Sequence, residues 1–230
     1  MKLKRLAIGF IAGLILMGIA VGIYWFSRDV EAEENKLSVP SLEEENAQIY
    51  LIDPSQTTLN FTIESSLRDI TGTFDIVGRW FELTETPDGW RVAIVLDIDG
   101  RTADTGMGLV DTLIREGFQA ERYPIGRFVG EADTLIDDLS VPHDVNMVGQ
   151  LELSGVVKDY SIAIHFQIKG DTLIANANTT IDAADFAVDF ASQIGSTDLD
   201  TKIKVVAVRS DDPIEDIRAR FETPTPSNEG

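Results

Sequence analysis

The chain of 230 residues contains no cysteine and only two histidines. Without cysteine it can form no disulfide, no thiolate metal site, no cysteine nucleophile and no cysteine-borne lipid anchor. Two histidines are too few for most metal sites and acid–base catalytic groups. The motifs typical of serine hydrolases, zinc proteases and P-loop nucleotide-binding proteins are also absent. The sequence therefore predicts no catalytic residue, no metal and no cofactor.

Basic residues are scarce as well, with 19 Lys and Arg against 39 Asp and Glu and a net charge of -20. Residues 1–28 hold four of the basic residues and none of the acidic ones, so the rest of the chain has 15 basic and 39 acidic residues, a net charge of -24. Such a domain is repelled by phosphate backbones and by anionic lipid surfaces. We expect no nucleic-acid partner.

One long run, Leu6–Phe26, carries no charge over 21 residues. As a helix it would be about 31 Å long, which matches the hydrocarbon core of a bilayer. Three basic residues precede the run and acidic residues crowd the far side, which favours a cytoplasmic N-terminus. The sequence thus predicts a single-pass protein of the cell membrane with its C-terminal domain outside the cytoplasm.

The alternative for this run is a cleaved signal peptide, but its apolar core is longer than the roughly 7 to 15 residues typical of one. Gly9 with Gly13, and Gly18 with Gly22, have the spacing that lets membrane helices approach closely. This spacing is compatible with a weak homodimer through the helix, although glycine is common in membrane helices generally.

The composition divides the chain into four parts. Residues 1–28 form the cytoplasmic stub and the predicted anchor, and residues 29–47 form an acidic stalk without sustained apolar periodicity. As a flexible coil this stalk would span about 25 Å. Residues 48–210 form the folded domain, and residues 211–230 a tail with a short helical segment.

The folded domain alternates apolar and polar residues with period two, most clearly at Trp90–Asp99. Shorter runs repeat the pattern at 59–63, 74–76, 151–153, 162–168 and 203–207, and turn residues separate many of them. Residues 107–116 predict one helix, and residues around 183–191 a second short one. The pattern predicts an all-β antiparallel sandwich or barrel of about eight strands.

The polar clusters offer little chemistry. Alternation places Asp97 and Asp99 on the outward face of a strand end, where we expect them to be solvated. His143 is expected in a loop and His165 on the polar face of its strand. By elimination a binding function is favoured, and an eight-stranded barrel can hold one elongated apolar ligand.

A series of short motifs runs in order from residue 50 to residue 186. The chain resembles the YceI family of periplasmic, lipocalin-like barrels in these segments: Tyr50–Pro54, Thr57–Phe61, Gly72–Phe74, Thr102–Gly106, Asp111–Leu113, Gly117–Phe118, Tyr123–Phe128, Gly149–Lys158 and Thr180–Phe186. The resemblance implies a barrel that holds an isoprenoid chain in its interior.

The departures from the family pattern fall mainly on polar positions. Gln56 and Thr57 replace His-Ser, Val110 replaces the Arg of an Arg-Asp pair, Ser154 replaces a histidine and Ala183 replaces an arginine. The aliphatic and aromatic pattern is kept except at Gly117. The resemblance therefore supports the barrel better than it supports a particular head group.

The candidate ligand is thus an apolar lipid, either an isoprenoid or an acyl chain. Gln56, Thr57 and Asp111 are the candidate head-group contacts. The candidate apolar lining consists of Phe61, Phe74, Trp80, Val92, Ile94, Leu96, Phe118, Phe128, Leu153, Ile164, Phe166 and Phe186. Each of these could instead be plain core packing. A barrel filled by its own side chains would be a structural or protein-interaction module, and an enzyme working through the acidic clusters is a third alternative.

Overall fold

A computed structural model of the chain describes residues 47–65, 68–188 and 196–221. In these ranges no helix has both the length and the apolar character needed to cross a membrane. The predicted span at residues 6–26 and almost all of the predicted stalk lie outside the described residues.

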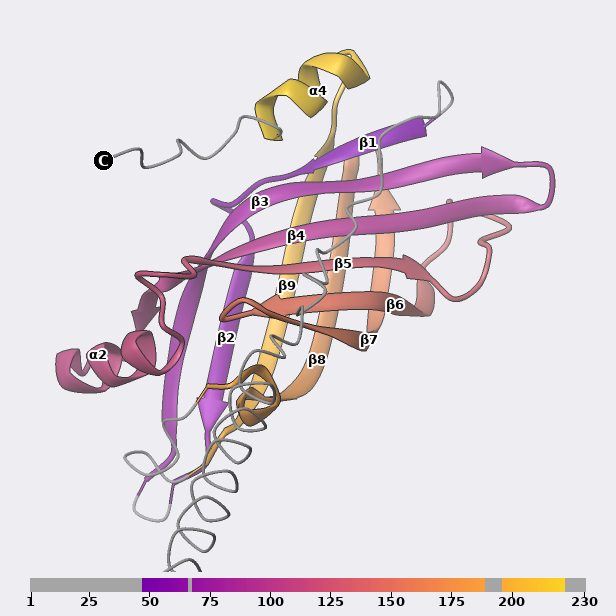
Figure 1. The fold of residues 1–230 in the computed structure, drawn as a ribbon. Helices are drawn as coiled ribbons and strands as arrows, with labels where there is room; N and C mark the ends of the chain where they lie inside the picture. The colour runs from indigo at the N-terminus through magenta and orange to yellow at the C-terminus, as the bar shows by residue number, and fades with distance from the viewer. Residues whose placement is uncertain (1–46, 66–67, 189–195, 222–230) are drawn as a thin grey trace, which may run out of the picture. The chain divides into compact units, whose positions relative to one another are not determined.

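The described residues form nine antiparallel strands and three short helices (Figure 1). They are, in chain order, β1 (Ala47–Ile52), β2 (Thr58–Ile63), β3 (Ile70–Thr86), β4 (Gly89–Asp104), α2 (Gly108–Gly117), β5 (Ile125–Ala132), β6 (His143–Leu153), β7 (Val156–Lys169), β8 (Thr172–Asp182), η1 (Ala183–Phe186), β9 (Asp198–Arg209) and α4 (Ile214–Phe221).

The strands close into a barrel with eight strand positions. From β2 to β9 each strand pairs with the next, and β9 pairs back with β2. β1 and β2 share one position, because both pair with β3 and β9 at different heights. Thr57, just before β2, fastens this interrupted position to β9, since its hydroxyl accepts a hydrogen bond from the Val206 amide at 3.1 Å. The predicted all-β antiparallel barrel with short helices is confirmed.

The inward residues of every strand form one continuous inner core. On β4 the inward series is Val92, Ile94 and Leu96, with Trp90 and Ile98 partly buried at its ends. This is the face that the period-two pattern of Trp90–Asp99 selects. Alternation along the other strands fills the interior in the same way.

An extra residue in β3 reverses which side chains point inward. Ile76 lies opposite Ile98, but Gly78 lies opposite Asp97, so two steps on β3 match one step on β4. Gly78 and Arg79 both have positive φ, 122° and 118°. Such a β-bulge shifts the alternation by one residue. Before it the even-numbered residues face the inner core, and after it the odd-numbered ones do.

A second, smaller apolar cluster lies on the outside of the barrel, over β1, β3, β4 and β5. We call it the outer cluster; its buried members are Ile49, Trp80, Val95, Val129 and Ile217. The helix α4 covers it with side chains spaced three and four residues apart, Ile214, Ile217 and Phe221. In Figure 1, α4 lies above β1.

Candidate functional site

Seven of the predicted lining residues surround two apolar cavities inside the barrel: Phe74, Ile94, Leu96, Phe118, Phe128, Leu153 and Ile164. Four others, Phe61, Val92, Phe166 and Phe186, belong to the inner core but are not among the residues lining either cavity. The inward face of the barrel therefore brings eleven of the twelve candidates together.

The first cavity lies at mid-height in the barrel and has a volume of about 30 Å³. Apart from Asn176, every residue around it is apolar: Phe81, Ile94, Leu96, Phe128, Met147, Ile162, Ile164, Ala175, Ala177, Ile203 and Val205. A water-sized group needs about 10 to 15 Å³ of such space, so this cavity has room for about two.

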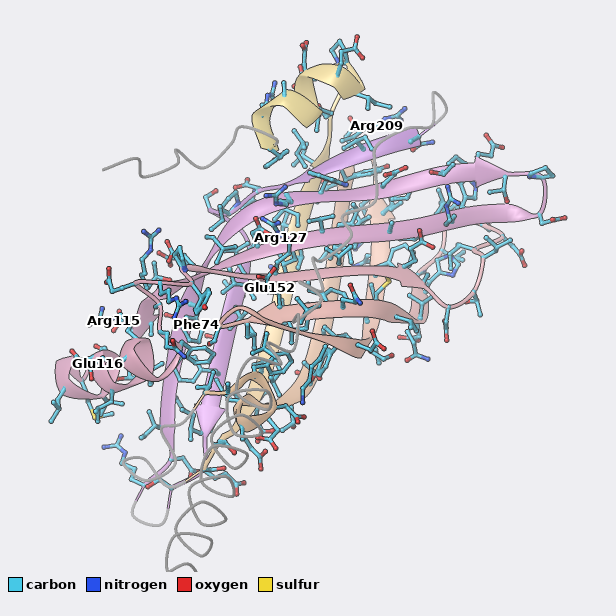
Figure 2. All side chains as sticks on the ribbon, viewed as in Figure 1. Phe74, Arg115, Glu116, Arg127, Glu152 and Arg209 are labelled. Atoms are coloured by element: carbon cyan, nitrogen blue, oxygen red, sulfur yellow. The ribbon has the colours of Figure 1, made fainter. Side chains whose placement is uncertain are left out.

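The second cavity, about 50 Å³, lies nearer the α2 end of the barrel. Phe74 and Phe118 form one wall, with ring centroids 5.8 Å apart in an edge-to-face arrangement. Figure 2 shows Phe74 at this end of the barrel, close to α2. Ser154 adds a buried polar group, but its hydroxyl donates to the Phe118 carbonyl oxygen at 2.9 Å and is satisfied within the protein.

The two cavities follow one another along the same strands. On β4, Ile94 and Leu96 face the first cavity, whereas Ile98 and Gly100 face the second. β9 repeats the arrangement, with Ile203 and Val205 at the first cavity and Leu199 and Thr201 at the second. The arrangement suits an elongated apolar group lying along the barrel.

Trp80 does not line the interior, contrary to the prediction. Its ring belongs to the outer cluster and lies 5.1 Å from the Phe221 ring of α4. The cause is the bulge at Ile76–Gly78, which turns Trp80 outward and brings Phe81 into the first cavity instead.

None of the three head-group candidates lies among the residues that line the two cavities. Gln56 donates to Asp53 across the turn between β1 and β2 at 2.7 Å, and Thr57 joins that turn to β9. Asp111 is buried in α2 and accepts hydrogen bonds from the amide and the hydroxyl of Thr105, at 2.7 and 2.6 Å. These side chains hold turns and a helix start in place.

The acidic pair of β4 is not solvated as expected. Asp97 faces outward but is only 3% exposed. Its carboxylate accepts hydrogen bonds from Arg79 at 2.6 Å and from Arg127 at 2.6 and 2.9 Å. The bonds to Asp97 raise the pKa of Arg127. Asp99 pairs with Arg101 at 2.7 Å, and these hydrogen bonds lower the pKa of Asp99.

The histidines take part in ordinary surface contacts. His143 begins β6 rather than lying in a loop, and His165 on β7 pairs with Asp144 on β6 at 2.8 Å. In the described part of the chain, no three His, Asp or Glu side chains gather in a group that could hold a metal ion.

Several lining residues carry side chains too small to give a hydrophobic signal in the sequence. Ala175 and Ala177 leave space at the first cavity, and Gly100 and Gly126 leave space at the second. A Cβ added at Gly126 would lie 2.7 Å from the Leu153 side chain, whereas one at Gly100 would meet nothing closer than 3.6 Å. The period-two pattern places all four on inward positions. The position of a residue in the alternation of its strand, rather than the size of its side chain, therefore indicates that it lines the interior.

Comparisons with known proteins agree on the fold. A family model described as YceI-like domain matches residues 50–208. Among solved structures, BcnA of Burkholderia cenocepacia is 17% identical with a TM-score of 0.54, over 68% of this chain and 99% of that one. A polyisoprenoid binding domain from Saccharophagus degradans, implicated in plant cell wall breakdown, is 16% identical with a TM-score of 0.53, over 70% of this chain and 98% of that one. A comparison with curated proteins finds no match.

Proposed function

Because the chain belongs to the family of YceI-like domains, we propose that its barrel binds one elongated apolar lipid, an isoprenoid or an acyl chain, along the two interior cavities. The protein would act as a carrier or a store for this lipid. The observation that carries the proposal is the succession of two apolar cavities along one set of strands.

The described cavities are small, so binding requires the interior to widen. Met147 and the phenylalanine rings at 81 and 128 are the flexible or bulky groups around the first cavity. Methionine adapts readily to a new neighbour because it is unbranched and has several rotatable bonds. An entering chain would exchange these packing contacts for its own.

Burial of the chain supplies the driving force. Each buried methylene contributes about 0.8 kcal/mol, so ten carbons offer about 8 kcal/mol before the cost of ordering the ligand and moving side chains. Micromolar affinity then needs no head-group contact, which fits the engagement of Gln56, Thr57 and Asp111 in the fold itself.

Two further features are supported by the sequence. The charge-free run Leu6–Phe26 would tether the barrel to the cell membrane, and the acidic stalk would keep it within about 25 Å of the lipid surface. The net charge of -24 after residue 28 would prevent the barrel from lying flat on anionic lipid. A tethered carrier would then exchange lipid with one membrane.

A second candidate is favoured by the cavity volumes of about 30 and 50 Å³. Barrels can be filled entirely by their own side chains. In that case the domain would be a structural or protein-interaction module that holds no ligand.

The two candidates are separated by a fragment of residues 37–230. It contains every described strand and helix and forms one compact unit. The fragment should be produced in a bacterial host that exports it across the cell membrane. After purification, its organic extract is examined by mass spectrometry. A fluorescent polyprenyl or fatty-acid probe should then be titrated into delipidated protein.

The carrier proposal expects a stoichiometric lipid, or probe binding at micromolar concentration. If the extract contains no lipid and neither probe binds, the carrier proposal is ruled out and the filled barrel remains. Phe128→Ala tests whether the probe binds at the first cavity, because it enlarges that cavity and should change probe affinity.

A further inference from the structure

The barrel wall is incomplete between β7 and β8. Their ladder runs from Lys169 opposite Thr172 to Ile164 opposite Ala177 and ends there. Both strands continue beyond that point, β7 back to Val156 and β8 on to Asp182. In Figure 1, β7 bends so that its first half follows β6, while β8 continues toward η1. We call the stretch where residues 156–163 of β7 and 178–182 of β8 are not paired with one another the seam.

Neighbouring strands show what a closed wall looks like. β6 pairs with β7 continuously from His143 opposite Phe166 to Leu153 opposite Val156. β8 pairs with β9 from Thr172 opposite Val208 to Asp182 opposite Asp198. Opening the wall there would break a row of backbone hydrogen bonds in a buried sheet, whereas opening the seam breaks none of the β7–β8 ladder.

Side chains rather than backbone bonds close the seam. Tyr160 of β7 reaches across it, and its hydroxyl donates to the Thr180 carbonyl oxygen at 2.8 Å. Lys158 pairs with Asp185 of η1 at 2.5 Å, and both side chains are substantially exposed, by 40% and 59%. Phe186 of η1 lies behind this pair, 2% exposed, with the Lys158 ammonium 5.9 Å from its ring.

The seam borders the second cavity. Ile181, on the β8 side of the seam, lines that cavity together with Leu153 and Ser154 at the turn that leads into β7. Phe186 belongs to the same inner core. A ligand passing between Tyr160 and Thr180 would therefore reach the interior without crossing a ladder.

From these contacts we propose that the seam is the entry site for the apolar chain, with η1 as its cover, Phe186 as the plug and the Tyr160–Thr180 contact as the latch. This inference rests on the proposed lipid-binding function. It also accounts for the widening that binding requires, because the seam is a place where the barrel circumference can increase without loss of ladder hydrogen bonds.

The chain has no cysteine, so introduced pairs give unique cross-links. In the 37–230 fragment, Lys158→Cys with Asp185→Cys places two exposed thiols across the seam. A short bis-methanethiosulfonate joins them, and a reductant releases them. The control pair is Asp144→Cys with His165→Cys, which replaces a similar surface pair across the complete β6–β7 ladder. The uptake rate of a fluorescent polyprenyl probe is measured by stopped flow.

Cross-linking across the seam should slow uptake about tenfold or more, equivalent to at least about 1.4 kcal/mol in the barrier, and reduction should restore it. Cross-linking of the control pair should leave the rate within about twofold. Equal rates for the linked and reduced seam pair would overturn the entry site while the lipid-binding function stands. If the untreated fragment binds no probe at all, the proposed function fails and the entry site fails with it.

The latch gives an independent measurement. Tyr160→Phe removes the hydroxyl that reaches Thr180 and should speed both uptake and release, with little change in equilibrium affinity. Tyr50→Phe, in the inner core beside β9, is the control and should change neither rate. Unchanged rates in Tyr160→Phe would remove the latch from the proposal.

Discussion

At the scale of single residues, Asp97 is the clearest case of a charge that the fold depends on. It is buried on the outer face of β4 between Arg79 and Arg127. Arg127 also faces Glu152, its partner residue on β6 (Figure 2). The Arg79 guanidinium lies over the rings of Trp80 and Phe221, so the charge network and the outer cluster support one another.

Asp97→Asn should therefore be strongly destabilising. Removing one partner of a buried ion pair leaves the others uncompensated and costs about 3 kcal/mol. Urea unfolding followed by tryptophan fluorescence measures the change. Asp99→Asn is the matched control, because its partner Arg101 is half exposed and solvent screens the pair, so its cost should be clearly smaller. Equal costs for the two variants would show that burial of Asp97 contributes nothing.

A second prediction at this scale concerns Gly100 in the second cavity. The space at this position admits a Cβ, whose nearest neighbours would be the Pro124 carbonyl oxygen at 3.6 Å and Ala120 at 3.7 Å. Gly100→Ala should leave probe affinity within about twofold. Gly100→Val adds an isopropyl group to a cavity of about 50 Å³ and should weaken binding about tenfold. Titration with the polyprenyl probe tests this, with thermal unfolding as the check on folding. An unchanged affinity in the valine variant would place the ligand elsewhere.

At the scale of elements, β3 shows where sequence reasoning stops. Period two correctly placed Phe74 inward on β3 and Ile94 and Leu96 inward on β4, because alternation follows directly from strand geometry. It failed at Trp80, since a bulge adds one residue and reverses the faces. Gly78 in mid-strand is the signal of such a bulge. With large residues at both 80 and 81, however, the sequence does not tell which one faces inward.

The polar head-group candidates stay a prediction, although the fold already engages each of them. Gln56, Thr57 and Asp111 occupy positions of family motifs, and each has a backbone or side-chain partner in the fold. The small lining residues, such as Ala177, leave no hydrophobic signal of their own. Their role is visible only where facing strands reveal the space that they leave.

The element that most needs its own test is α4, which lies beyond the family match. Ile217 is fully buried in the outer cluster, whereas Ile214 is only partly buried. Ile217→Ala should cost about 2 to 4 kcal/mol in the free energy of unfolding, and Ile214→Ala clearly less. Denaturant unfolding of the fragment measures both. Neither should alter probe affinity, because the outer cluster lies on the other side of the barrel wall. A cost for Ile217→Ala no larger than that for Ile214→Ala would mean that α4 does not hold this face.

At the scale of the whole molecule, the excess of carboxylates governs the response to acid. Hydrogen bonds from Ser55 and Gln56 lower the pKa of Asp53, those from Arg101 lower that of Asp99, and those from Ser140 lower that of Asp138. A carboxylate whose pKa is lower in the folded state binds protons more readily when unfolded. Its contribution to stability is full above the unfolded value of about 3.9 and is lost as the pH falls through the folded pKa.

The free energy of unfolding should therefore fall as the pH drops below about 4, and one variant isolates the part due to a single pair. Asp99→Asn should be less stable than the parent fragment at pH 6, and the difference should shrink as the pH falls through the lowered pKa of Asp99. Arg101→Met removes the partner and should show the same convergence, because the lowered pKa of Asp99 depends first on Arg101. Urea midpoints measured from pH 6 to pH 2 give both curves. A difference that stays constant over this range would mean that the Asp99–Arg101 bond does not contribute to acid stability.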